Sequence, residues 1–311
     1  MKSNKKGFIP VMLTPYSSTG TVDYDGLSRI TEFYLESGAV GLFANCLSSE
    51  MYELTPDERL LTTRHVLRVV EGQVPVVATG NFGRTLQEQA DFVKRMGDTG
   101  VAAVILVTGL LAGEDESDEV FLENAFTLMD RTAGIPVGFY ECPLPYKRIL
   151  KASQLSQLLE TNRVIYHKDT CLDIEQVREK IAVARGYDFA LYDAYLGHAV
   201  ASLAAGSDGL SCIQGNFFPE IIVWLCEHFN DPDLTDEVNA VQQFLIENMD
   251  VMHAVYPPVA KYYLQKRGMK ISTYCRTTKE VVDATVRENI DKLFNDCMKL
   301  REDIGIRSLS Y

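Results

Sequence analysis

The sequence predicts an α/β protein whose main part is a (β/α)8 barrel, a TIM barrel, with a C-terminal helical extension. Eight short apolar segments recur along the first two thirds of the chain, and segments of helical period separate them. Runs such as "VPVVAT", "VAAVILV" and "IPVGFY" are almost continuously hydrophobic, which is typical of parallel strands buried on both faces. An open doubly wound sheet would show the same runs. The count of eight and the lack of a glycine-rich nucleotide motif after the first run favour the barrel.

Strand ends and helix starts follow from the same periodicity. Capping boxes "TPDE" (55–58) and "TLQE" (85–88) mark the starts of two helices between strands. The expected strand ends are Leu13, Ala44, Gly80, Val107, Tyr140, Lys168, Asp193 and Ile213.

The pattern changes after Phe229, where "NDPDLTDE" (230–237) forms a polar, proline-containing break. We therefore divide the chain into a barrel with the active site (residues 1–229) and a C-terminal helical bundle (residues 230–311). Helices are expected near Asp236–Met252, Pro257–Gln265 and Thr278–Asp303. Their apolar stripes need a partner surface, either the barrel or another subunit.

Composition excludes several functional classes. The formal charge of −13 disfavours nucleic acid and anionic membrane surfaces as partners. No apolar run reaches the length of a membrane span, and the N-terminal residues lack the apolar core of a signal peptide, so we expect a cytoplasmic protein. The 7 cysteines contain no C-x-x-C pair, and the 5 histidines no H-x-H, so we expect neither disulfides nor a metal or other cofactor.

Lys168 ends the sixth expected strand, in "VIYHKDT" (164–170). Barrel strands end at the face where active sites are built. A lysine desolvated there has a lowered pKa and offers a free amine that can attack a carbonyl carbon. Tyr140 ends the preceding strand and is the candidate proton shuttle. The alternatives are a lysine that merely reaches solvent along its apolar stem, and a tyrosine that is a packed core ring.

At this pair the sequence resembles the dihydrodipicolinate synthase and N-acetylneuraminate lyase family of aldolase-type barrels. "FYECP" (139–143) is similar to the family's Y-N-x-P, and "HKDT" (167–170) to its I-K-[DE]-[ST]. "GFIPVMLTPYSSTGTVD" (7–23) and "SSEMYELTPDER" (48–59) resemble its opening strand and the segment after its G-[ST]-T-G-E loop. The resemblance implies that Lys168 forms an imine, that Tyr140 shuttles protons, and that the protein is a homo-oligomer, a tetramer or a dimer.

The same resemblance places a carboxylate-binding loop at Cys46–Glu50. Ser48 falls on the threonine that holds a 2-oxo acid, Leu47 replaces that threonine's hydroxyl-bearing neighbour, and Ser49 replaces a glycine. We therefore expect Leu47, Ser48 and Ser49 to contact substrate. The alternative is that the two serines only satisfy the backbone of the loop.

Other positions depart from the pattern of dihydrodipicolinate synthases. Leu110 and Leu111 stand where these enzymes carry the second tyrosine of a hydroxyl relay, and their arginine is replaced in the region Leu144–Tyr146, with Lys147 and Arg148 just beyond. A true dihydrodipicolinate synthase is therefore not expected.

Further candidates for substrate contacts lie at three strand ends. Glu141 and Asp193 could select the distal part of the substrate, with Tyr195 and His198 near Asp193, although these could equally be a surface acid, a packed ring and an exposed histidine. Gly209 and Leu210 open the eighth-strand segment that leads to Asn216, and a glycine there would allow close approach to the imine lysine. The alternative is an ordinary strand-to-helix loop.

The leading hypothesis is a Schiff-base-forming lyase that makes or breaks a C–C bond of a 2-oxo acid, pyruvate-like or derived from a sugar acid. Two alternatives remain at this stage. One is a sugar-acid dehydratase that uses the same lysine imine, and the other is a barrel that binds its ligand without turnover.

Overall fold

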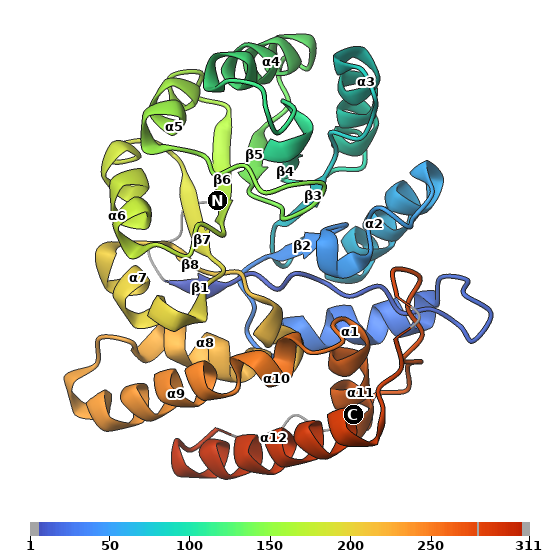
Figure 1. Ribbon diagram of the computed structural model, residues 1–311, viewed down its shortest axis with the longest axis vertical. Helices are drawn as coiled ribbons and strands as arrows, with labels where there is room; N and C mark the ends of the chain where they lie inside the picture. Colours follow the sequence, from blue (N-terminus) through green and yellow to red (C-terminus); the bar gives the residue numbers. More distant parts are fainter. Residues whose placement is uncertain (1–5, 279, 307–311) are drawn as a thin grey trace.

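The computed structural model describes residues 6–278 and 280–306. It confirms a closed barrel of eight parallel strands surrounded by helices (Figure 1). Each strand pairs with its neighbours in chain order, and β8 pairs with β1. The last seam, between β1 and β2, is closed by the parallel bridge of Val11 with Phe43, where Phe43 N–H donates to Pro10 O at 3.0 Å. The strands are β1 (Gly7–Phe8), β2 (Leu42–Ala44), β3 (Val76–Thr79), β4 (Ala103–Val107), β5 (Val137–Tyr140), β6 (Val164–Asp169), β7 (Ala190–Asp193) and β8 (Gly209–Leu210).

Helices α1 to α8 follow the strands in alternation and form the outer ring. The capping boxes are confirmed, because Thr55 Oγ1 accepts from Glu58 N–H at 3.2 Å while Glu58 Oε2 accepts from Thr55 N–H at 2.9 Å, and Thr85 and Glu88 repeat the arrangement. The helices are α1 (Tyr24–Glu36), α2 (Pro56–Val70), α3 (Leu86–Gly97), α4 (Asp118–Arg131), α5 (Ala152–Leu159), α6 (Ile174–Val183), α7 (Ala199–Ala205) and α8 (Pro219–His228). Short 3-10 turns follow four strands, at Leu47–Ser49, Thr108–Leu110, Leu196–His198 and Ile213–Asn216.

Side chains alternate along every strand between two separate cores. Tyr140, Tyr166 and Tyr192 point into the barrel, where they join Phe43 and Ile105. Their neighbours in sequence point outward, into the layer between the strands and the helices. This alternation decides which residues at the strand ends can face the mouth of the barrel.

Six expected strand ends agree with the structure to within one residue. The first and last are wrong. Strand β1 ends at Phe8 instead of Leu13, because Pro10 has no N–H to continue a ladder, and only Val11 pairs again, as a single bridge. Strand β8 ends at Leu210, because the chain turns into a 3-10 helix at Ile213.

The C-terminal segment forms α9 (Thr235–Glu247), α10 (Met249–His253), α11 (Pro258–Lys266) and α12 (Ala284–Asp303). Helix α12 starts later than expected because Asp283 caps it, with Oδ1 accepting from Val286 N–H at 2.9 Å. Lys279, inside the expected helix, and the chain ends at 1–5 and 307–311 lie outside the described residues.

Helices α9, α10 and α11 lie against the barrel, and α12 packs on their outer side (Figure 1). Leu245, Tyr263 and Leu293 belong to the same continuous apolar cluster as Phe33 of α1 and Ile221 of α8. The C-terminal segment therefore extends the outer core of the barrel. Across the part of the chain that the structure describes, helices with both the length and the apolar content for a membrane crossing are absent.

Gly209 is required by packing where β8 meets β1. A Cβ atom built there would lie 1.7 Å from Gly7 O, and neither backbone can retreat without breaking the pairing of the two strands. We expect Gly209→Ala to lower the free energy of unfolding by more than about 3 kcal/mol. Gly113→Ala is the control, because its Cβ would meet nothing closer than 3.4 Å, and its effect should stay within about 0.5 kcal/mol. Urea unfolding of the two variants checks this, and equal midpoints would contradict it.

Candidate active site

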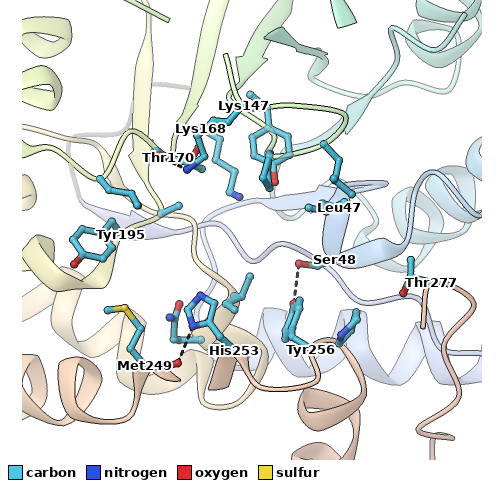
Figure 2. A pocket seen from close by; sticks show the side chains of 18 residues that line it. Leu47, Ser48, Lys147, Lys168, Thr170, Tyr195, Met249, His253, Tyr256 and Thr277 are labelled. Atoms are coloured by element: carbon cyan, nitrogen blue, oxygen red, sulfur yellow. Dashed lines mark hydrogen bonds between the residues drawn. The ribbon is translucent and has the colours of Figure 1, made fainter. Parts of the chain in front are cut away.

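A cavity of about 500 Å3 opens at the carboxyl ends of the barrel strands. Leu47, Ser48, Lys168 and Tyr195, all named as candidates by the sequence analysis, line it (Figure 2). Tyr140 also lines the cavity. The other lining residues come from strand ends, loops and the C-terminal segment: Pro143, Leu144, Lys147, Thr170, Leu172, Ala194, Ile213, Gln214, Met249, His253, Tyr256, Pro257 and Thr277.

Lys168 and Tyr140 are neighbours across the β5–β6 pair. Their Cα atoms are partners in the ladder, and both side chains point into the barrel, so Lys168 Nζ lies 4.2 Å from the centre of the Tyr140 ring. Lys168 is 4% exposed, and burial lowers the pKa of its amine. Burial also raises the pKa of the Tyr140 phenol well above its usual value. The pair therefore combines an amine that is easily deprotonated with a phenol that keeps its proton.

Acidic side chains are absent from the cavity wall. Among the described residues that line it there is no aspartate and no glutamate, although the whole chain has a formal charge of −13. Lys147 is a second lysine in the wall, and its Nζ donates to Thr170 O at 3.0 Å. The cavity is thus a locally basic region of an acidic protein.

A chain of hydrogen bonds determines the direction of the Ser48 hydroxyl. Asn216 Nδ2 donates to Val11 O at 3.0 Å and to the Tyr256 hydroxyl at 2.6 Å, and Tyr34 donates to Asn216 Oδ1. Because the Tyr256 oxygen accepts, its own proton goes to Ser48 Oγ, at 2.8 Å (Figure 2). The Ser48 proton has no acceptor among the described residues. It is free to be donated to an anionic group in the cavity.

Tyr256, His253, Met249, Pro257 and Thr277 are lining residues that sequence reasoning missed. They lie beyond Phe229, in the segment that we assigned to a separate bundle. A tyrosine before two prolines carries no motif, although both residues that it bonds, Ser48 and Asn216, are named in the sequence analysis.

Glu50 explains how this distant segment reaches the site. Its buried carboxylate accepts from Lys261 Nζ at 3.1 Å, from Thr277 N–H at 2.9 Å and from Arg276 N–H. Glu50 stands two residues after Ser48, so one carboxylate joins the C-terminal segment to the Ser48 loop.

Three expected substrate contacts lie outside the cavity and are corrected. Ser49 is buried below the loop, where its Oγ donates to Met12 O at 2.6 Å and accepts from Cys46 N–H at 3.1 Å, so it satisfies the loop backbone. The close approach at Gly209 is to Gly7 and not to Lys168. Leu210 points outward into the core between strands and helices.

Glu141 and Asp193 are corrected for another reason. Each follows an inward-facing residue, Tyr140 or Tyr192, so each faces outward. Asp193 is fully buried, where Oδ2 lies 2.8 Å from His198 Nε2 and Oδ1 accepts from Tyr195 N–H at 2.9 Å. Of the three candidates near this strand end, Asp193, Tyr195 and His198, only Tyr195 lines the cavity.

Glu141 belongs to a buried charge cluster that we call the outer cluster, formed by Glu141, His167, Asp169 and Lys180. Lys180 of α6 reaches in to place its Nζ 2.6 Å from Glu141 Oε1 and 2.6 Å from Asp169 Oδ2. Glu141 also accepts from the N–H groups of Leu150 and Thr170, at 3.0 and 2.7 Å. Glu141, His167 and Asp169 are spaced as metal ligands could be, but the Lys180 ammonium already contacts both carboxylates. The residues present therefore suit an ion pair better than a metal.

His167 completes the charge balance of the outer cluster. Its Nδ1–H donates to Phe139 O at 3.2 Å, so only a protonated ring can also present an N–H to the carboxylates 3.4 and 3.6 Å from Nε2. Burial opposes this proton, but Asp169 and Glu141 outweigh burial and raise the pKa of His167. With His167 charged, two cations balance two carboxylates.

Comparison with known proteins assigns the chain to an enzyme family. The sequence matches the Dihydrodipicolinate synthetase family over residues 4–296. The protein is a lyase of the aldolase type. The chain belongs to the dihydrodipicolinate synthetase family.

Individual relatives are distant but cover most of the chain. A 4-hydroxy-tetrahydrodipicolinate synthase of Shewanella pealeana is 23% identical over 85% of this chain and 88% of its own. A probable 2-dehydro-3-deoxy-D-pentonate aldolase of Escherichia coli K12, YjhH, is 22% identical over 86% of this chain and 89% of its own. Among solved structures, YagE of E. coli K12 in complex with pyruvate has a TM-score of 0.82 at 21% identity, covering 96% of this chain and 99% of that chain.

Removing the Lys180 charge should destabilise the protein strongly. Lys180→Met leaves two buried carboxylates with only His167 to balance them, and we expect a loss of about 3 to 5 kcal/mol in the free energy of unfolding at neutral pH. Lys151→Met is the control, because Lys151 pairs with Asp118 while 62% exposed, and its loss should be below about 1 kcal/mol. Urea unfolding measures both, and similar losses would contradict the outer cluster's role.

Proposed function

We propose that the protein is a Schiff-base-forming lyase that makes or breaks a C–C bond of a 2-oxo acid. Lys168 forms the imine, Tyr140 transfers protons, and Ser48 orients the carboxylate. The observation that carries this proposal is the buried Lys168 amine, whose pKa is lowered and which faces the cavity beside Tyr140. The pyruvate complex of the structural relative YagE is consistent with a 2-oxo acid.

The chemistry follows from the two groups. The free amine adds to the C2 carbonyl to give a carbinolamine. The Tyr140 phenol gives its proton to the departing hydroxyl group, so water leaves and an iminium and a Tyr140 phenolate remain. The iminium withdraws electrons, so the C3–C4 bond of a 4-hydroxy-2-oxo acid can break as the Tyr140 oxygen takes the C4 hydroxyl proton. An aldehyde leaves, the enamine is protonated at C3, and water releases pyruvate and Lys168. Condensation is the reverse.

The electrostatics of the cavity suit an anionic substrate. A wall with Lys168, Lys147 and no acid among the described residues attracts a carboxylate despite the overall negative charge. The directed Ser48 proton supplies one hydrogen bond to it. The imine uses the protein's own amine, so the proposed reaction needs no cofactor.

We further propose that the protein works in the cytoplasm as a homo-oligomer, a tetramer or a dimer, without nucleic acid or membrane partners. Support comes from the family resemblance and the negative charge. Light scattering on the purified chain would measure the subunit number.

Borohydride reduction in the presence of pyruvate should add one reduced adduct at Lys168. We expect intact mass and peptide mapping to find it there, and Lys168→Ala to abolish both adduct and turnover. Because burial lowers the Lys168 pKa, the trapping rate should rise with pH and level off at a lower pH than for an exposed lysine. Lys147→Met is the matched control, in which trapping at Lys168 should persist. An adduct mapped to Lys147 would contradict the proposal.

Ser48→Ala and Tyr256→Phe should both weaken binding of the 2-oxo acid. The first removes the donor and the second removes the bond that directs it, so we expect KM for pyruvate to rise roughly 5- to 50-fold with a smaller effect on kcat. Tyr262→Phe is a control, because Tyr262 contacts Asp291 away from the cavity. Steady-state kinetics distinguish the variants, and an unchanged KM in Ser48→Ala would contradict the assigned role.

A further inference from the structure

Most of the cavity wall beyond the reacting groups is hydrocarbon. Apart from Lys168, Tyr140 and Ser48, the wall includes Leu47, Leu144, Leu172, Ile213 and Met249. Leu144 and Leu172 come from the loops that follow β5 and β6, the strands that carry Tyr140 and Lys168. A substrate bound to Lys168 therefore extends along apolar side chains.

Several polar groups in the rest of the wall are used inside the protein, whereas the buried Gln214 Oε1 has no hydrogen-bond partner among the described residues. Thr170 Oγ1 donates to Glu141 O, Thr277 Oγ1 donates to Glu50 Oε2 at 3.2 Å, and Lys147 Nζ donates to Thr170 O. His253 Nδ1 bonds Met249 O at 2.7 Å, and the Tyr195 hydroxyl is turned away from Lys168 (Figure 2). A polyhydroxylated chain would give up hydrogen bonds to water and find few partners in return.

Exposed apolar side chains gather at the mouth of the same cavity. Leu144 and Leu172 are 49% and 52% exposed, and they are two of the six large apolar side chains of the described chain that are at least 40% exposed. Exposed apolar surface beside a reaction centre is typical of a ligand-binding surface. An apolar ligand group would cover both leucines, whereas a sugar chain would leave them in contact with polar groups.

We propose that the part of the substrate beyond its 2-oxo acid group is apolar, an alkyl or aryl group, and is not a polyhydroxylated sugar chain. The proposal rests on the proposed function, because Lys168 and Ser48 fix the 2-oxo acid end. In the condensation direction the enamine carbon of bound pyruvate attacks the carbonyl carbon of an apolar aldehyde. One C–C bond forms, the aldehyde oxygen takes a proton from Tyr140, and water hydrolyses the imine to release a 4-hydroxy-2-oxo acid.

A panel of aldehydes tests the proposal. The enzyme is incubated with pyruvate and propanal, pentanal, benzaldehyde or glyceraldehyde, and the 4-hydroxy-2-oxo acid product is measured by mass spectrometry. Each methylene buried against the wall should raise kcat/KM roughly fourfold, so pentanal should exceed propanal by at least about tenfold. Glyceraldehyde, with the same carbon count as propanal, should fall below it by about tenfold, because its hydroxyl groups lose water.

Variants in the wall provide the second part of the test. Leu172→Asn and Met249→Gln should reduce the pentanal to propanal ratio several-fold. Leu61→Asn is the matched control, because Leu61 is 50% exposed like Leu172 but lies outside this cavity, and it should keep the ratio.

Borohydride trapping of pyruvate in the same samples distinguishes failure of the proposed function from failure of this inference alone. Without an adduct at Lys168, the proposed function fails and this inference with it. With an adduct, a preference for glyceraldehyde, equal rates for propanal and pentanal, or no condensation at all overturns the inference alone. A rise from propanal to pentanal that disappears in Leu172→Asn supports it.

Discussion

The two-residue alternation of side chains along parallel strands is the constraint on which the site depends. It sends Tyr140 and Lys168 into the barrel and their neighbours Glu141 and Asp169 outward. Tyr140 and Lys168 are partners in the β5–β6 ladder, so the backbone itself places the amine and the phenol side by side. The same alternation keeps two carboxylates within a residue of the reaction centre yet on the other side of the sheet, where they cannot neutralise the inner lysine.

Two of the buried lysines, Lys168 and Lys180, show how the surroundings of a lysine determine its role. Lys180 lies 2.6 Å from each of two carboxylates, which raise its pKa against the effect of burial, so it is a permanent cation that holds α6 to the strands. Lys168 has burial but no carboxylate, and its pKa is lowered. Desolvation without a carboxylate partner lowers the pKa of a lysine. Desolvation beside two carboxylates leaves the lysine charged, as part of a buried ion pair.

Much of the barrel could be predicted because strand spacing and capping boxes are local signals, and Lys168 and Tyr140 could be placed at one cavity because they end neighbouring strands. Glu141 and Asp193 were misplaced because adjacency in sequence was taken as adjacency in space, although the strand period already places them on the opposite face from Tyr140 and Tyr192. Tyr256 could not have been found. It reaches Ser48 through a hydrogen bond across 208 positions of sequence, which no local pattern encodes.

The hydrogen bonds of Glu50 join two segments of the chain that are synthesised at different times. All eight strands precede α8 in the chain, so they are synthesised before Lys261, Arg276 and Thr277, the residues that bind Glu50. A chain that ends after α8 contains Lys168 but lacks Tyr256, which directs the Ser48 proton. The proposed nucleophile is thus present before the proposed carboxylate donor is directed, so a partly made chain contains the amine before the complete ligand site.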